Sequence, residues 1–472
     1  MSIESLDSTA NLRSKTKWWT PRLAWPVIAA AVVRFTLLAV TLARNGTSAL
    51  IDSDTSSYLE PGRNLLLHGR FIADGAPDLL RTPGYPLFLA ITSLAGLPAA
   101  AVANVILSVL SVVLVWKLGK TVFGDDRIAL GAAWIFAFEP ISVIYSSILL
   151  SEPLFIALFL LSLERLTMFL RERNLPVLVA AGLWLAAATF VRPVTYYLPA
   201  ALAVGLFVVL ARVPGLRWKA PAVLLISVLP WLAAWQIRNW IETGYSGFSS
   251  AGDEGLYDFV LPAVIGEAEH RSYMIVRDEL GYPDFYHVYL GSSGQTYLSQ
   301  AYLAQNPGQA VWSQGQRIAF IHSEAVRVIR AHFGAYLRLC FKSLFRTVFE
   351  LGAGSLDLLL NIENPGHATS LIVSESLARQ GIALTKASPW VAVEKTAFAI
   401  VLLGLYLFAA RGAFHASMHD ACLWLLLGML LYFFTVSAMA HPVGAARFRL
   451  PIMSVVCIFA SAGFLRKNTI AR

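Results

Sequence analysis

A short polar stretch, Ile51-Asp-Ser-Asp-Thr-Ser-Ser-Tyr58, lies between the first two long apolar runs of the chain, and Arg81-Thr-Pro-Gly-Tyr-Pro86 follows it. The 472-residue chain as a whole is 57% hydrophobic and only 14% charged. Charged side chains next to a bilayer are costly, and they tend to mark substrate sites or ion pathways. The two carboxylates of the first stretch, Asp52 and Asp54, are therefore the first candidates for a functional site.

The composition is that of a membrane protein. Soluble domains carry roughly 25% charged residues, well above the 14% found here. The net charge of +8 is explained by basic residues that flank membrane spans, so we expect no nucleic-acid partner. The three cysteines lie far apart and predict neither a zinc site nor a disulfide framework. The polar N-terminus lacks a signal-peptide cleavage site, so we expect the first apolar helix to be retained.

Apolar runs predict an all-α polytopic fold. A helix needs roughly 20 apolar residues to cross a bilayer, and the chain offers about ten such runs, at 24–43, 99–118, 128–144, 153–170, 176–191, 194–211, 221–237, 391–410, 421–440 and 450–465. Lys and Arg gather at alternate ends of these runs, which favours both termini in the cytoplasm. The prediction is a cytoplasmic N-terminus (1–23), a transmembrane region (24–238) with its first outer loop at 44–98, an extracytoplasmic or interfacial region (239–390), C-terminal transmembrane helices (391–466) and a cytoplasmic tail (467–472).

The outer segments carry further helical patterns. Residues 58–68 predict a helix within the first outer loop, and the apolar stretch 87–97 predicts a segment at the membrane surface. Residues 317–349 read as a basic amphipathic helix that lies in the membrane interface. The alternative is an extra pair of short spans near 335–360, which would raise the count from ten to twelve.

The order of these features resembles the signature of a known superfamily. Asp54, Tyr58 and Gly69, followed by the Arg81 motif, come directly after a first membrane helix. This arrangement resembles the GT-C glycosyltransferases, and most of all the branch of protein mannosyltransferases and the lipid A aminoarabinose transferase. The resemblance covers most of the chain except 250–390. In that family Glu commonly follows the first Asp, whereas Thr55 stands there here.

The resemblance implies a function and a location. Such enzymes move a sugar from a polyprenyl-phosphate donor to an acceptor, which can be a lipid, a glycan or a protein. It implies a multi-pass protein of the bacterial inner membrane, surrounded by membrane lipids, with its active site facing the periplasm. No cofactor follows firmly from the sequence, and a divalent metal is left open.

Sugar transfer requires a base for the acceptor hydroxyl, and Asp54 is the candidate. Tyr58 lies four residues later, on the same helical face. Asp52 is left open as a second carboxylate. The alternative for Asp54 is a structural one, because an Asp before Thr-Ser-Ser-Tyr is also a good N-cap.

The Arg81 motif predicts a fixed turn, because it holds two prolines and a glycine. The resemblance places Arg81 and Tyr85 beside the donor, whereas the alternative for Arg81 is contact with lipid headgroups. Glu152 resembles the second acidic position of the family. It could contact the acceptor, orient a basic side chain or help to hold a metal, or it could mark only the start of a helix.

Arginines at the outer ends of spans are the candidate phosphate ligands, because the bias towards cytoplasmic Lys and Arg should deplete them there. Arg192, Arg238 and Arg447 occupy such positions. A guanidinium fork can hold two phosphate oxygens, and Arg447 is the best candidate, with an interfacial anchor as its alternative. Arg449 is expected to point elsewhere. His441 could be a secondary ligand or a structural residue.

Two other functions remain open. A secondary transporter or lipid flippase would be expected to show repeated halves, which we do not find. A polymerase or ligase of the O-antigen type also uses outer arginines, but the Asp54 and Arg81 motifs are not expected in it. No glycine-rich nucleotide loop is present, which disfavours a nucleotide-sugar donor.

Overall fold

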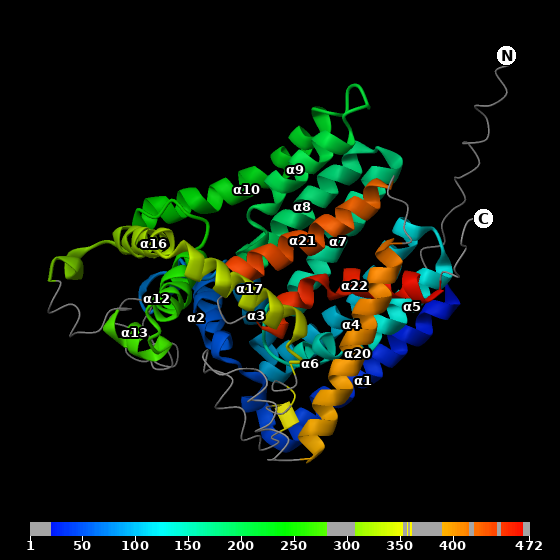
Figure 1. Cartoon of the computed structure of the whole chain (residues 1–472), viewed down its shortest axis with the longest axis horizontal. Coiled ribbons are helices and arrows are strands. Elements are labelled where there is room, and N and C mark those ends of the chain that lie inside the picture. The colour runs from blue at the N-terminus through cyan, green and yellow to red at the C-terminus, as the bar shows by residue number, and fades with distance from the viewer. Residues whose placement is uncertain are drawn as a thin grey trace.

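The protein is a bundle of long helices with smaller helices gathered at one end. A computed structural model describes residues 20–280, 307–352, 356, 359–360, 389–414, 420–440 and 445–465. The long bundle helices in Figure 1 are α1 (Ala24–Asn45), α4 (Leu97–Phe123), α7 (Glu152–Glu172), α8 (Leu175–Val191), α10 (Lys219–Thr243), α20 (Pro389–Phe414), α21 (Ala421–Ala440) and α22 (Leu450–Leu465). The described strands are β1 (Ile72–Ala73) and β2 (Ala76–Pro77), which form a small antiparallel hairpin.

The predicted polytopic helical fold is confirmed, and every predicted apolar run falls on a helix or a helix pair. Seven described helices are long and apolar enough to cross a membrane, or up to eight if a bent pair counts as one span. Helix α8 and the segment 193–209, which contains α9 (Leu198–Val209), are apolar but shorter. The predicted count of ten is therefore not reached by long helices alone. Within the described residues, the segment 335–360 adds no candidate span.

The predicted run at 128–144 is not one straight helix. Helix α5 (Asp126–Ala137) and helix α6 (Pro140–Ser146) meet at a bend of 55°. Proline cannot continue a helix from within, because its ring clashes with the preceding turn, and Pro140 begins α6 instead. Glu139 caps α6 by accepting hydrogen bonds from the N–H groups of Ile141 and Ser142.

Arg34 of α1 is fully buried against this bend. Its guanidinium donates to the carbonyl oxygens of Phe136 and Ala137, at 3.3 and 2.7 Å, where α5 ends. It also donates to the hydroxyls of Ser108 and Ser142. The last carbonyls of a helix have no partner within it, so Arg34 supplies the donors that the broken helix lacks.

The smaller helices lie at one end of the bundle, on the left of Figure 1. They include α2 (Ser53–His68), α12 (Leu261–Glu269), α13 (Tyr273–Glu279) and α16 (Gln314–Ala331). The single amphipathic helix predicted for 317–349 is wrong in one respect, because the chain breaks at His332 into α16 and α17 (Phe333–Phe349). Helix α17 then packs along α21.

The glycine of the Arg81 motif is required by packing. Helix α3 (Gly84–Thr92) begins inside the motif. The last three residues of the motif are therefore helical, and only the three residues before them form the predicted turn. A Cβ atom at Gly84 would lie 2.6 Å from the carbonyl oxygen of Phe190 in α8. A Cβ atom at Gly62 of α2 would lie 2.1 Å from the carbonyl oxygen of Pro86. The motif therefore lets α3 approach both α2 and α8 closely.

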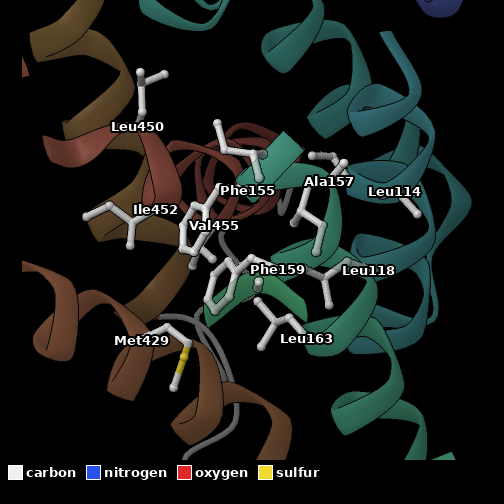
Figure 2. Packing of buried hydrophobic residues seen from close by; sticks show 14 of the residues in the cluster. Leu114, Leu118, Phe155, Ala157, Phe159, Leu163, Met429, Leu450, Ile452 and Val455 are labelled. Carbon is white, nitrogen blue, oxygen red and sulfur yellow. The ribbon is translucent and has the colours of Figure 1, made fainter. Parts of the chain in front are cut away.

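Two central helices carry the apolar core towards the site. Every residue of α22 from 450 to 463 is buried, and α7 is buried over most of its length. Figure 2 shows Phe155 and Phe159 of α7 packed between residues of α4 and α22. Glu152 begins α7, and Arg447 precedes α22 by one short turn. Both side chains thus lie at the ends of well-packed helices.

Candidate active site

Asp52, and not Asp54, caps helix α2. The Asp52 carboxylate accepts a hydrogen bond from the backbone N–H of Asp54, and the hydroxyl of Thr55 accepts one from the backbone N–H of Asp52. These two bonds form a capping box, which pairs two N–H groups left without partners at a helix start. The alternative that Asp54 is the N-cap is therefore wrong. The side chain of Asp54 is left to make other contacts.

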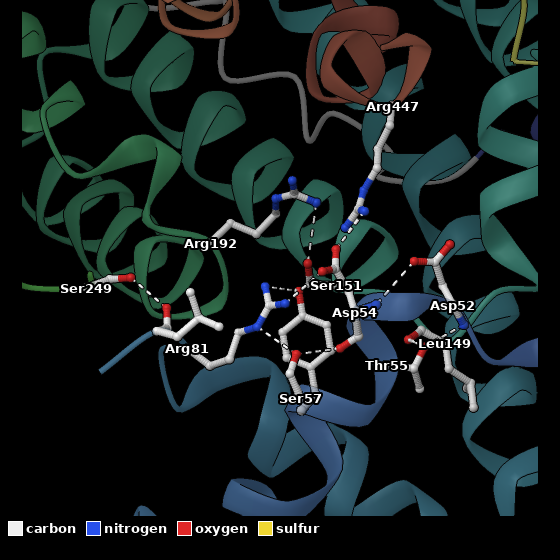
Figure 3. Close-up of polar contacts among 12 residues, drawn as sticks. Asp52, Asp54, Thr55, Ser57, Arg81, Leu149, Ser151, Arg192, Ser249 and Arg447 are labelled. Atoms are coloured by element: carbon white, nitrogen blue, oxygen red, sulfur yellow. Dashed lines mark hydrogen bonds and ion pairs between the residues drawn. The ribbon is translucent and has the colours of Figure 1, made fainter. Parts of the chain in front are cut away.

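Arg81 is held by three side chains of α2. Its Nη2 donates to Oδ1 of Asp54 at 2.7 Å, its Nε to the Ser57 hydroxyl at 2.8 Å, and its Nη1 to the Tyr58 hydroxyl at 3.2 Å. The guanidinium also lies 4.4 Å from the centre of the Tyr58 ring, close enough for a cation–π contact. Asp54 and Tyr58 share one face of α2, as the sequence predicts, and Arg81 donates to both. Figure 3 shows Arg81 beside Asp54 and Ser57.

Arg447 links Asp54 to Glu152, which lies far along the chain at the start of α7. Its Nη1 donates to Oδ2 of Asp54 at 2.7 Å, and its Nε donates to Oε1 of Glu152. Arg192 reaches the same Oε1 of Glu152 through Nη1 and lies 3.4 Å from the Ser151 hydroxyl. Figure 3 shows Arg192 and Arg447 approaching from separate elements. Three guanidiniums and two carboxylates thus share one site, which we call the arginine cluster: Asp54, Arg81, Glu152, Arg192 and Arg447.

The electrostatics of the arginine cluster keep Asp54 ionised. Burial would raise the pKa of the Asp54 carboxyl, but the guanidiniums of Arg81 and Arg447 hold that pKa well below its usual range. Asp54 also lies in the first turn of α2 and Glu152 in the first turn of α7. Helix N-termini favour negative charge. The Asp54 carboxylate therefore remains available as a proton acceptor at neutral pH, with its basicity reduced by the arginines.

Two further predicted site residues, Tyr85 and Arg238, lie outside the arginine cluster. Tyr85 is fully buried and packs edge-on against Tyr58, with ring centres 4.9 Å apart, so it supports Tyr58 from behind. Arg238 binds the carbonyl oxygens of Phe71 and Asp78 and pairs with Glu242. His441 lies outside the described residues.

Arg238 acts on the cluster only at a distance. The loop that it holds includes Asp78, whose carboxylate accepts hydrogen bonds from the backbone N–H groups of Leu80 and Arg81, at 2.8 and 3.0 Å. Burial raises the pKa of Asp78 to about 6. Arg238 therefore fixes the backbone that presents Arg81, and it does not itself face the carboxylates.

Arg449 points away from the cluster, as expected. Its Nη1 donates to the carbonyl oxygens of Thr347 and Glu350, at the end of α17. The side chain is 1% exposed. Arg449, two residues after Arg447, thus supplies a donor to carbonyl oxygens at the end of α17.

A cavity of about 1240 Å³ lies against the arginine cluster. Asp54, Arg81, Arg192 and Arg447 line it, together with residues of α12, α13 and α21 and of α11 (Ala251–Gly255). Ligand pockets usually measure about 300–1,000 Å³. This cavity is therefore large enough for two substrates to meet beside the cluster.

The part of the lining that sequence reasoning missed comes from residues 245–277. It includes Tyr245, Asp253, Glu254 and Asp258. Burial, followed by the charge of Asp258, raises the pKa of Glu254 to about 8. The same segment supports the Arg81 loop, because the Ser249 hydroxyl donates to the carbonyl oxygen of Leu80 at 2.7 Å.

One of the site residues that was not predicted carries a signal in the sequence, whereas the others do not. Ser57 could have been found, because it lies three residues after Asp54 on the same helical face. Residues 245–277 lie where the family resemblance fades, and no spacing links them to Asp54.

The described residues provide no ready-made metal site. No group of three His, Cys, Asp or Glu side chains in the described part of the chain is arranged to hold a metal ion. Within the cluster, each carboxylate accepts from arginines instead. The side chains around Asp54 therefore give no support to a bound divalent metal.

Comparisons with known proteins agree with the resemblance of the motif. Residues 82–235 match the family model of dolichyl-phosphate-mannose-protein mannosyltransferase. Over these residues, this match confirms the predicted similarity to protein mannosyltransferases that use a dolichyl-phosphate sugar. The matched segment contains Glu152 and Arg192 and begins directly after Arg81. No curated protein matches the chain.

Solved structures of two kinds are similar to this chain. The apo oligosaccharyltransferase of Archaeoglobus fulgidus is 12% identical, with a TM-score of 0.49, over 95% of this chain and 50% of that one. ArnT from Cupriavidus metallidurans bound to undecaprenyl phosphate is 16% identical, with a TM-score of 0.40, over 89% of this chain and 77% of that one. The chain spans about half the length of the oligosaccharyltransferase that it matches.

Proposed function

We propose that the protein is an inverting glycosyltransferase that moves a sugar from a polyprenyl-phosphate donor to a hydroxyl acceptor at the outer face of the cytoplasmic membrane. The observation that carries this proposal is the arginine cluster, in which a candidate base and two cavity-lining arginines meet beside a large cavity. The match of residues 82–235 to the mannosyltransferase family supports it.

In the proposed reaction, Asp54 accepts the proton of the acceptor hydroxyl. The hydroxyl oxygen then forms a bond to the anomeric carbon, and the bond between that carbon and the phosphate oxygen breaks. The electron pair of the broken bond stays on the phosphate, where Arg447 and Arg192 stabilise the growing charge. A base of this kind contributes about 10²–10⁴ in rate. A single displacement inverts the configuration at the anomeric carbon.

Glu152 holds the two phosphate-binding arginines together. It is 1% exposed, and its Oε1 accepts from both Arg192 and Arg447. A carboxylate that organises two guanidiniums fits the role of orienting basic side chains, one of the three left open by the sequence. The acceptor, a lipid, a glycan or a protein, would occupy the part of the cavity lined by residues 245–277.

The test of this function is the lipid that accumulates in cells lacking the protein. We expect one sugar-loaded polyprenyl monophosphate to accumulate, and the wild-type protein to reverse this while Asp54→Asn does not. Accumulation of an oligosaccharide on a polyprenyl pyrophosphate would instead favour a polymerase or ligase. Reversal by Asp54→Asn would contradict the proposal outright.

The proposed orientation has its own test. Every predicted cytoplasmic segment is basic, which supports an outward-facing cavity. In a Cys340→Ser background, cysteines near Ser56 and Ser250, at the exposed positions Ser56 and Gly252, should react with an impermeant reagent added outside. Cysteines at Asp125 and Gly215 should not. Labelling of Gly252 and Gly215 from one side would contradict this topology.

A further inference from the structure

The guanidinium of Arg447 is divided between two carboxylates. Its Nε donates to Glu152 and its Nη1 to Asp54, while no acceptor in the described part of the chain takes a hydrogen bond from Nη2. A fork that holds two phosphate oxygens must use two neighbouring nitrogens. For Arg447, either pair includes a nitrogen that already donates to a carboxylate. A phosphate bound there would therefore share a nitrogen with Asp54 or with Glu152.

Arg81 differs from Arg447 in this respect. All three of its nitrogens donate to side chains of α2, namely Ser57, Tyr58 and Asp54. It also lies over the Tyr58 ring. Arg81 is thus fixed to the same helix as Asp54 and has little reason to leave it. Arg192, which donates through Nη1 alone to Ser151 and Glu152, has nitrogens to spare for a ligand.

The charge of the cluster fits one monoanion. Three guanidiniums face two carboxylates, which leaves one formal positive charge. A phosphodiester that links a sugar to a polyprenyl chain carries one negative charge. Buried charges are stable only when they are paired, so a bound diester would complete the pairing that the free protein lacks.

Building on the proposed function, we propose that the donor phosphate draws Arg447 away from Asp54, so that Asp54 becomes an effective base only after the donor has bound. Arg81 stays with Asp54 and keeps its carboxylate in position. Arg447 remains tied to Glu152 and carries its Nη1 and Nη2 to the phosphate. The donor thereby switches on the base that acts on the acceptor.

This exchange changes the proton affinity of Asp54. In the free protein, Arg81 and Arg447 together hold the Asp54 pKa well below its usual range, against the effect of burial. An opposite charge in contact lowers a carboxyl pKa by about 1–3 units. Loss of Arg447 and arrival of the phosphate both raise the Asp54 pKa. The complex then holds more protons than the free protein, so binding takes up protons and tightens as the pH falls.

The groups around Asp54 limit which residue can take up that proton. The charged and titratable side chains that face it come from five elements: Tyr58 on α2, Arg81 on the loop before α3, Glu152 on α7, Arg192 at the end of α8, and Arg447 before α22. Beyond these, Arg81 interacts with the buried carboxyls of Asp78 and Glu254, whose pKa values burial raises to about 6 and about 8. The arginines stay charged at every relevant pH. Glu152 is thus the competing proton acceptor within the cluster.

The test is proton uptake on binding of a non-transferable phosphodiester. The probe is a short polyprenyl methyl phosphate, which stays a monoanion. Calorimetry in two buffers of different ionisation enthalpy counts the protons taken up on binding. The measurement is made at about pH 5.5, between the usual Asp pKa and neutrality. The variants are Asp54→Asn and Glu152→Gln. Asp52→Asn serves as the matched control, because it removes a carboxylate two residues away whose side chain caps α2.

We expect uptake of a fraction of a proton by the wild type, by Asp52→Asn and by Glu152→Gln, and none by Asp54→Asn. Wild-type affinity should also rise as the pH falls from about 7 to about 5. Binding without proton uptake, or uptake that persists in Asp54→Asn, would overturn the proposal while leaving the donor site intact. Failure of the probe to bind at all would instead count against the proposed function.

Discussion

Two arginines, the partly buried Arg447 at the cavity and the fully buried Arg34 at the α5–α6 bend, have contrasting surroundings. Both lie within a largely apolar helix bundle, where a charged side chain is expected to be functional. Arg34 donates to main-chain carbonyls and serine hydroxyls and lines no part of the large cavity. Arg447 donates to two carboxylates and lines that cavity.

The partners of a buried arginine therefore reveal its role better than its burial does. Carbonyls at a helix end need a donor whether or not a ligand binds, so Arg34 completes the fold. Paired carboxylates beside a cavity can exchange their arginine for an incoming anion. Arg449, which closes α17, belongs with Arg34 despite lying two residues from Arg447.

Among the arginine variants, the largest effect on transfer should follow from Arg447→Lys. Lysine keeps the charge but loses the planar fork that can bridge Asp54, Glu152 and the phosphate. Because charge on the phosphate grows in the transition state, turnover should fall about 10²-fold and apparent donor affinity should also weaken. The measurement is steady-state transfer from a defined polyprenyl-phosphate sugar.

Arg449→Lys is the matched control for that change. It should leave turnover per folded molecule near the wild-type value and reduce thermal stability, because its contacts are two carbonyls at the end of α17. Unchanged kinetics for Arg447→Lys, together with a large defect for Arg192→Lys or Arg238→Lys, would move the phosphate site to those arginines.

A small or no effect on transfer is expected from Arg34→Gln. The substitution should leave at least one carbonyl at the end of α5 without its donor, at a cost of about 1–3 kcal/mol for each unsatisfied group. Thermal unfolding in detergent should therefore occur at a lower temperature, while the turnover of the remaining folded protein stays close to normal. A loss of turnover without a loss of stability would contradict the assignment of a structural role to Arg34 and a functional role to Arg447.

The sequence predicted the helices better than their ends. Apolar runs located the spans, because the cost of leaving polar backbone groups in lipid requires long helices. The break at Glu139 and Pro140 was not predicted, since average hydropathy does not register that Pro140 must begin a helix. The break at His332 was not predicted either, because the amphipathic pattern continues through it.

The site could be predicted where its residues lie close together in the sequence. Asp54 and Tyr58 lie on one turn of helix, and their spacing was enough to pair them. The bridge from Asp54 through Arg447 to Glu152 joins three distant segments, so no spacing could reveal it. Arg238 resembled Arg447 in the sequence because both are arginines at outer helix ends, but its carbonyl partners depend on how the 71–78 loop folds.

The central claim is that Asp54 is the base of a site that binds the donor through arginines. Its most direct test measures donor binding and transfer together in Asp54→Asn, with Asp52→Asn as the control. Asn keeps the size of the side chain and removes one negative charge from the cluster. We predict that transfer falls by at least about 10²-fold while a polyprenyl-phosphate donor binds at least as tightly as to the wild type. Near-normal transfer by Asp54→Asn, or equal losses in both variants, would contradict the claim.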